Sequence, residues 1–291
     1  MKAKVAFIPC AGFGSRMGPI GKSIPKPLWP LFGKTLLEHQ INYCRELGFS
    51  HFVINAHHLK DQFIEFEEQI KLKEGEKLSI LVEDPLLGNG GSFHNIKKSF
   101  PDIEEVFVFN PDSFLMMSPK DWSKFFNEAE LKTNLLITIP CKEEDQYNRF
   151  VVDKKNCLLE IRPPSAGNAP NLTYAGFGKV NLEAFPYVKG ASSFFETVAD
   201  PKTEKVFTYE VEDYEYWDLG TLDLYRKVVS TLHSNKNTRL YSFLKNYDSS
   251  DTDFSSYNAE KNGCFNFTQE RLSCEERGIF IRKDLPKIHL D

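Results

Sequence analysis

A loop that is rich in glycine and cations follows the first apolar run of the chain. Its sequence is CAGFGSRMGPIGKSIPKPL, residues 10–28. Gly12 and Gly14 allow backbone angles at which successive N–H groups can converge on an anion. Arg16 offers a planar fork of donors that suits a polyphosphate, and Lys26 adds a compact charge between two restricting prolines. These residues predict a phosphate-binding loop, and the competing interpretation is a structural turn with solvated cations.

Two common phosphate motifs do not account for this loop. A dinucleotide fingerprint needs a glycine three positions after Gly14, where the chain has Met17. A P-loop that ends in Gly21-Lys22-Ser23 needs a glycine at the position of Arg16. The loop is therefore of another kind.

Two aspartates lie where a carboxylate has little reason to pack. Asp112 ends a very apolar run, and Asp218 follows Trp217 at the start of a predicted helix. Two carboxylates that converge at strand ends suit Mg²⁺, which takes few protein oxygens together with substrate phosphates. The alternatives are a turn residue for Asp112 and a helix N-cap for Asp218.

Strand-like and helix-like segments alternate up to about residue 140. This order predicts an α/β protein with a mainly parallel, doubly wound sheet, and such sheets bind ligands at the carboxyl ends of their strands. The expected strands are Val5–Pro9, His51–Asn55, Leu78–Val82, Val106–Phe109 and Leu135–Ile139, and the expected helices are Lys34–Leu47, Leu59–Gln69, Gly91–Phe100 and Lys120–Leu131.

The pattern changes after residue 140. The later expected elements are a hairpin of Phe150–Asp153 with Cys157–Ile161, a strand at Tyr174–Val180, a helix at Thr221–Leu232 and short β pieces such as Gly278–Arg282. A polar stretch, NYDSSDTDFSSYN, lies between the helix and these last pieces.

Composition excludes several classes of protein. The chain has 291 residues and a net charge of −5, which argues against a general nucleic-acid or membrane surface. We expect no membrane span and no secretion leader. The six cysteines, at positions 10, 44, 141, 157, 264 and 274, show no C-x-x-C pairing and are expected to be free thiols. The sequence predicts a cytoplasmic protein.

The loop and several later segments resemble the signature of sugar-phosphate nucleotidyltransferases. That signature is G-x-G-[ST]-R-[LM]-x-P, then P-K-P-[LM], then G-K-x-L-x-E. The matching segments are Gly12–Pro19, Pro25–Leu28, Gly33–Glu38, INAHHLKDQ (54–62), PLLGNGGSF (85–93), FNPD (109–112) and WDLGT (217–221). The resemblance extends over about residues 3–230. It is greatest to the branch with mannose-1-phosphate guanylyltransferases and N-acetylmuramate-1-phosphate uridylyltransferase, and it implies a Rossmann-like fold.

The resemblance implies a reaction and roles for residues. A sugar 1-phosphate would attack the α-phosphorus of a nucleoside triphosphate (NTP) and expel pyrophosphate, with Mg²⁺ held by Asp112 and Asp218. Arg16 would hold the β- and γ-phosphates, and Lys26 would lie near the α-phosphate. The implied nucleotide-binding residues are Ala11, Gly12, Gly14, Ser15, Glu83, Gly88 and Asn89.

Glu83 falls where relatives contact the base through a side chain. A carboxylate only accepts hydrogen bonds, so it suits the N–H groups of guanine or uracil. This favours GTP or UTP.

The implied sugar-phosphate-binding residues are Asn148, Arg149 and Gly176. The chain departs from the family in this half, with Arg162-Pro163-Pro164 where many relatives have Glu-Lys-Pro. It also has Pro111 where relatives have glycine before the metal carboxylate. The identity of the sugar is therefore not transferred from relatives.

We expect a catalytic domain at residues 1–233, with its nucleotide half at 1–112 and its sugar-phosphate half at 113–233. Residues 234–291 would form an extension that caps the sheet, mediates self-association into a homo-oligomer or closes over the sugar. Two alternative functions stay open: a cytidylyltransferase for a non-sugar phosphate such as phosphocholine, and a catalytically silent regulatory homologue.

Overall fold

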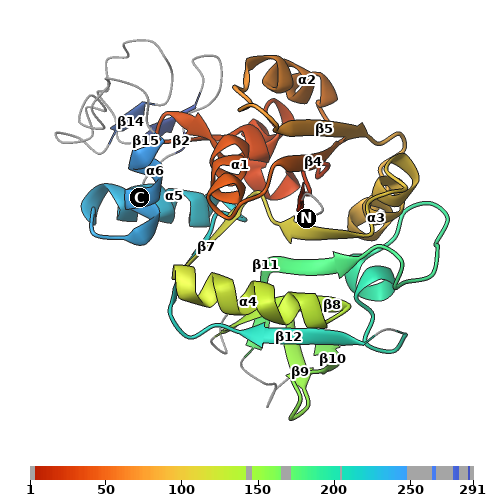
Figure 1. Ribbon diagram of the computed structural model, residues 1–291. Coiled ribbons are helices and arrows are strands. Elements are labelled where there is room, and N and C mark those ends of the chain that lie inside the picture. The colour runs from red at the N-terminus through yellow and green to blue at the C-terminus, as the bar shows by residue number, and fades with distance from the viewer. Residues whose placement is uncertain are drawn as a thin grey trace.

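A seven-stranded mixed sheet runs through the computed structural model of the chain (Figure 1). The structure describes residues 4–141, 146–164, 172–203, 205–247, 264–266, 278–281 and 288. In spatial order the strands are β12 (Val206–Glu210), β8 (Asn134–Pro140), β11 (Leu172–Asn181), β6 (Glu105–Phe109), β1 (Val5–Ile8), β4 (His51–Ala56) and β5 (Lys77–Val82). Of these seven, β11 runs antiparallel to both of its neighbours. The predicted mainly parallel α/β sheet is confirmed.

The helices begin where the sequence offers caps. The α-helices are α1 (Leu36–Glu46), α2 (Lys60–Gln69), α3 (Gly88–Ser99), α4 (Pro119–Leu131), α5 (Leu222–Ser234) and α6 (Arg239–Asn246). The side chains of Thr35, Ser118 and Thr221 accept hydrogen bonds from backbone N–H groups in the first turns of α1, α4 and α5. Gly48 takes a φ of +84° just after α1, a conformation that ends helices and favours glycine.

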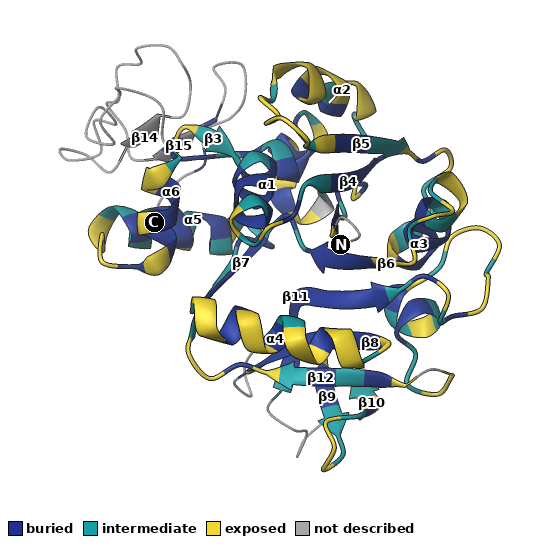
Figure 2. Ribbon diagram, viewed as in Figure 1, coloured by how far each residue is buried: buried dark blue, intermediate teal, exposed yellow. Residues whose placement is uncertain are grey.

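Two-residue periodicity of the central strands divides the core into two layers. Ala6 and Ile8 of β1 face a core shared with α1, α4 and α5, whereas Val5 and Phe7 face a core shared with α3. Figure 2 shows that the central strands β6 and β11 are buried and that the outer sides of α2 and α4 are exposed. The sheet is therefore covered on both faces, as expected for a doubly wound fold.

Four small ladders complete the described fold. They pair β2 (Pro30–Leu31) with β3 (Lys34–Thr35), β7 (Ser113–Met117) with β13 (Tyr214–Asp218), β9 (Arg149–Val152) with β10 (Leu158–Arg162), and β14 (Cys264–Asn266) with β15 (Gly278–Phe280). The β9–β10 pair is the predicted hairpin. Short helical turns occur at Ser15–Lys22, Lys26–Leu28 and Phe194–Val198 (η3).

The structure differs from the predicted elements at α3 and α6, and it adds strands that were not predicted, among them β7, β12 and β13. α3 begins at Gly88, three residues before the predicted start, because segment 190–193 packs on its first turn. α6 was not predicted, and its Leu240, Phe243 and Leu244 are buried in the main core. This part of the expected extension therefore packs into the main hydrophobic core.

Of the polar stretch at 246–258, only the first two residues are among the described residues, and Cys274 also lies outside them. Cys10, Cys44, Cys141 and Cys157 carry no disulfide. None of the described helices has the length and apolar character that a membrane crossing requires.

Candidate active site

The glycine loop is anchored at its start by one buried asparagine. Asn55, at the end of β4, accepts hydrogen bonds through Oδ1 from the backbone N–H groups of Cys10 (2.6 Å) and Ala11 (3.2 Å). Gly14 then takes a left-handed conformation with φ +62° and begins the turn at Ser15–Lys22. Asn55 thereby fixes where the loop leaves β1, so the segment that follows can curve over the end of the sheet.

The loop closes around a cavity of about 330 Å³, here called the loop cavity. It lies at the carboxyl ends of β1, β4 and β6, where parallel sheets bind ligands. Eight of the sequence-predicted residues line it: Ala11, Gly12, Gly14, Arg16, Lys26, Gly88, Asn89 and Asp112. Ser15 lies in the same loop, and its side chain is outside the described part of the structure. The structure thus brings together residues that are up to 101 positions apart in the chain.

The two cations of the loop cavity have different surroundings. Lys26 Nζ lies 2.5 Å from Asp112 Oδ2, and the two side chains are only 10% and 20% exposed. A largely buried lysine is costly without such a partner, so Asp112 holds it in place. Arg16 is exposed and forms no ion pair among the described residues. Its guanidinium is therefore available to an anion.

Asp218 ends β13 and Asp112 comes directly before β7, so their backbones meet at one end of the β7–β13 ladder. Asp218 pairs with Ser113, and the Leu219 N–H donates a hydrogen bond of 2.8 Å to the Asp112 carbonyl. Burial raises the pKa of Tyr216 far above its ordinary value. The negative charge of Asp218 raises this pKa further, and that of Asp112 adds a weaker contribution. Both carboxylates therefore act on the same small region.

Two donors orient the Asp218 carboxylate. Tyr147 donates its hydroxyl proton to Oδ2 and the Gly220 N–H donates to Oδ1, each at 2.5 Å. A Cβ at Gly220 would come within 2.7 Å of Oδ1, so any larger residue there would displace this carboxylate oxygen. Tyr147 was not among the residues expected from the sequence, and nothing in its local sequence marks it.

The donor set fits Mg²⁺. Among the described residues there is no group of three or more histidine, cysteine and acidic side chains that could hold a metal alone. A pair of hard carboxylates, with the remaining ligands from water and phosphate, is the usual arrangement for Mg²⁺ in phosphoryl-transfer sites. Asp112 and Asp218 could supply that pair, although Lys26, Tyr147 and the Gly220 N–H already contact their oxygens.

Glu83 does not face the loop cavity as expected. Its side chain is 2% exposed and accepts hydrogen bonds from Asn55 Nδ2 (2.8 Å), Ser92 Oγ (2.6 Å) and the Leu87 N–H (3.0 Å). The carboxylate therefore links the ends of β4 and β5 to α3, and these donors occupy the oxygens expected to bind a base.

The predicted sugar-phosphate residues are also placed differently. Asn148 is exposed, and Arg149 is 2% exposed with its guanidinium donating to Cys141 Sγ, so neither lines a cavity described here. Gly176 does not line the loop cavity and instead packs against Asn110, which does. A Cβ at Gly176 would come within 2.8 Å of Asn110 Nδ2. Gly176 makes room for Asn110, which belongs to the FNPD segment (109–112) and was not predicted as a binding residue.

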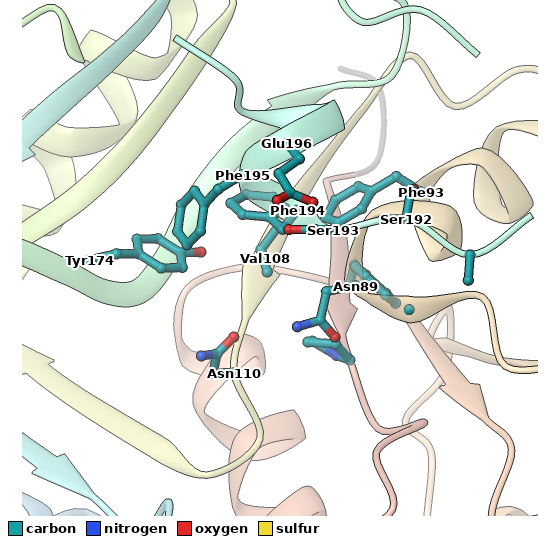
Figure 3. Close-up of a pocket in the computed structure, with 14 residues that line it drawn as sticks. Asn89, Phe93, Val108, Asn110, Tyr174, Ser192, Ser193, Phe194, Phe195 and Glu196 are labelled. Carbon is teal, nitrogen blue, oxygen red and sulfur yellow. The ribbon is translucent and has the colours of Figure 1, made fainter. Parts of the chain in front are cut away.

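A second cavity of about 690 Å³, here called the aromatic cavity, adjoins the loop cavity. Both are lined by Pro9, Gly88, Asn89 and Asn110. Figure 3 shows Tyr174, Phe194, Phe195 and Glu196 on one side of the aromatic cavity and Asn89 and Asn110 on another. Apart from Gly88 and Asn89, no residue that lines it was predicted from the sequence as a binding residue.

Where the two cavities meet, the glycines at the start of α3 pack closely against segment 190–193. The Gly90 N–H donates to the Ser192 carbonyl (2.8 Å), and the Ser192 N–H donates to the Leu87 carbonyl (2.9 Å). Gly88 has φ +70°, and a Cβ there would lie 2.7 Å from the Ser192 oxygen. These contacts allow segment 190–197 to form a wall of the aromatic cavity.

The chain belongs to the family of MobA-like NTP transferase domains, which it matches over residues 6–166. Among curated relatives it is 29% identical over 184 residues to a bifunctional sugar-1-phosphate nucleotidylyltransferase/acetyltransferase of Sulfurisphaera tokodaii, covering 63% of this chain and 42% of that protein. It is 28% identical over 158 residues to a D-glycero-α-D-manno-heptose 1-phosphate guanylyltransferase of Campylobacter jejuni, covering 54% and 66%. The chain thus spans less than two thirds of the length of each of these relatives.

Two solved structures share the fold of this chain. HddC from Yersinia pseudotuberculosis superposes with a TM-score of 0.66 at 19% identity, covering 79% of this chain and 99% of that one. A UDP-glucose pyrophosphorylase in complex with UDP-glucose superposes with a TM-score of 0.67 at 16% identity, covering 80% and 99%. The Rossmann-like nucleotidyltransferase fold is confirmed.

Proposed function

We propose that this protein transfers a nucleotidyl group from an NTP to a sugar 1-phosphate, giving a nucleotide-sugar and pyrophosphate with Mg²⁺. The observation that carries the proposal is that the two cavities adjoin. The loop cavity is lined by Arg16, Lys26 and Asp112, charges that suit a triphosphate with a metal, and it shares Asn89 and Asn110 with a larger cavity that would hold an acceptor. The curated relatives, which include guanylyl- and uridylyltransferases, support the same reaction.

The NTP would lie in the loop cavity with its phosphates against the glycine loop. N–H groups of residues 11–14 and the Arg16 guanidinium would bind the β- and γ-phosphates, and Arg16 would stabilise the departing pyrophosphate. Lys26 would approach the α-phosphate from its position beside Asp112 and neutralise charge that develops during attack. Chemistry of this kind needs positioning and charge more than a protein nucleophile.

Asp112 and Asp218 would hold Mg²⁺, which neutralises phosphate charge when it is bound. Tyr147 and Gly220 fix the Asp218 carboxylate for this role. Because Lys26 also contacts Asp112, one carboxylate would join the metal site to the cation near the α-phosphate. We keep GTP or UTP as the expected nucleotides, now on the basis of the relatives, because Glu83 is directed inward.

The test is Mg²⁺-dependent pyrophosphate release from a grid of substrates. GTP, UTP, CTP, dTTP and ATP are each combined with mannose, glucose, N-acetylglucosamine, N-acetylmuramate and heptose 1-phosphates. Release with one pair, lost in Asp112→Asn, is the expected result. No release with any pair, while nucleotide or nucleotide-sugar still binds, would contradict the proposal and favour the silent regulatory homologue.

A further inference from the structure

The aromatic cavity combines several rings with a single charged side chain among the described residues that line it. Five of its residues carry aromatic rings: Phe7, Phe93, Tyr174, Phe194 and Phe195. Glu196 is the one charged side chain among the described residues that line it, and the charge is negative. The cavity therefore offers ring surfaces and a carboxylate, and it offers no cation to bind an acidic substituent.

Three of the rings form a cluster in which Phe195 meets the other two edge to face, while Tyr174 and Phe194 are stacked at 19°. Phe194 and Phe195 have centroids 4.9 Å apart at 73°, and Tyr174 lies 5.7 Å from Phe195 at 88°. Ring faces carry partial negative charge and attract cations. The Tyr174 hydroxyl is buried without a hydrogen-bond partner in the described part of the chain, so a donor brought by a ligand would satisfy it.

Glu196 belongs to the same short helical turn as two of these rings. The turn is held by hydrogen bonds from Thr197 Oγ1 to the Ser193 carbonyl (2.5 Å) and from the Ala199 N–H to the Phe194 carbonyl (2.9 Å). Glu196 is exposed and forms no ion pair with any described residue. Figure 3 shows it on the same side of the cavity as Phe194 and Phe195.

The opposite end of this cavity meets the loop cavity. The shared residues, Asn89 and Asn110 among them, place Lys26 and Arg16 beyond that junction. An acceptor whose phosphate faces these cations would therefore extend its other end toward the rings and Glu196.

We propose that the aromatic cavity selects an acceptor phosphate whose distal part carries a positively charged nitrogen. Both an amino sugar 1-phosphate and a phosphorylated amino alcohol have this chemistry. The ammonium group would lie against the rings of Phe194 and Phe195 and pair with the Glu196 carboxylate. This inference rests on the proposed function, because it assigns the acceptor of the same reaction.

The test compares acceptors that differ only in that charge. Glucosamine 1-phosphate is measured against glucose 1-phosphate, and phosphocholine against 3,3-dimethylbutyl phosphate, each with Mg²⁺ and GTP, UTP or CTP. We expect the cationic member of at least one pair to have a kcat/KM about tenfold higher or more. The pair that responds distinguishes the sugar from the amino alcohol.

A charge-neutral variant identifies the residue responsible. Glu196→Gln is expected to raise KM for the cationic acceptor about tenfold and to leave KM for the NTP unchanged. Glu68→Gln, on the exposed face of α2 and outside both cavities, is the matched control and should change neither value. A Glu196→Gln variant with unaltered preference for the cationic acceptor would overturn the role of this side chain.

The outcomes separate this inference from the proposed function. Faster turnover of glucose 1-phosphate and 3,3-dimethylbutyl phosphate, which lack the cationic nitrogen, would overturn the inference and leave the nucleotidyltransferase proposal intact. Absence of pyrophosphate release with every acceptor, charged or neutral, would overturn both.

Discussion

The loop cavity and the aromatic cavity differ in how the chain builds them. The loop cavity takes most of its lining from residues 9–27, so its glycines and cations are close in the sequence. The aromatic cavity takes its rings from β1, α3, β11 and η3, which are spread over 188 positions between Phe7 and Phe195. The comparison suggests that the nucleotide end of the site is held by local backbone geometry and the acceptor end by long-range packing.

The largest effect is expected from the buried cation of the loop cavity. Lys26→Met should lower kcat/KM roughly 100- to 1,000-fold, because it removes a charge aimed at the transferred phosphate. Steady-state pyrophosphate release measures this, with a thermal melt to show that the variant folds. Lys22→Met is the control, since Lys22 is exposed in the same loop and lines neither cavity. Equal losses in the two variants would mean that only the net charge of the loop matters.

The joint between the two cavities should be the next most sensitive point. Gly88→Ala is expected to lower the free energy of unfolding by about 3 kcal/mol, from backbone strain at φ +70° and a close contact with the Ser192 oxygen. Gly75→Ala has a similar φ of +80° with open space around the Cβ, so about 1 kcal/mol is expected. Urea unfolding of both variants measures the difference, and equal values would refute the tight contact at position 88.

A third prediction separates a structural carboxylate from a nucleotide-binding one. Glu83→Gln should lower the free energy of unfolding by about 2 kcal/mol, because an amide cannot accept the bonds from Asn55, Ser92 and Leu87 equally well. The ratio of kcat/KM for GTP and UTP should stay the same. A changed nucleotide ratio at unchanged stability would restore Glu83 to the base-binding role expected from the sequence.

The smallest effect is expected from one hydroxyl beside the carboxylate pair. Tyr147→Phe should weaken the apparent affinity for Mg²⁺ about tenfold, because it removes a donor that orients Asp218. A titration of pyrophosphate release with Mg²⁺ measures it. Tyr187→Phe is the control, because that side chain is 74% exposed and lies outside both cavities. An unchanged midpoint in Tyr147→Phe would contradict a positioning role.

The sequence predicted the sheet and the loop cavity well for a physical reason. Apolar periodicity marks buried strands directly, so β1, β4, β5, β6 and β8 were each predicted within one or two residues. The loop residues and Asp112 carry distinctive chemistry in a short, ordered motif. Their neighbourhood in space therefore followed from the carboxyl ends of parallel strands.

The aromatic cavity, the direction of Glu83 and the start of α3 could not be predicted, because they depend on contacts between residues that are distant in the sequence. Phenylalanines at 194 and 195 look like core residues in the sequence, and only their position opposite Asn89 makes them cavity walls. The inward direction of Glu83 depends on Asn55 and Ser92, which belong to other elements. The early start of α3 likewise depends on segment 190–193, about 100 residues later.

The central claim is that the two cavities hold the two substrates of one reaction. The most direct measurement is pyrophosphate release from a single NTP, with Mg²⁺, in the presence and absence of the acceptor phosphate identified from the substrate grid. With an NTP labelled in its base or ribose, we expect pyrophosphate to be released only when both substrates are present. The label should then be recovered in the nucleotide-sugar product. Release of the same size without an acceptor, or tight binding of both substrates without release, would contradict it.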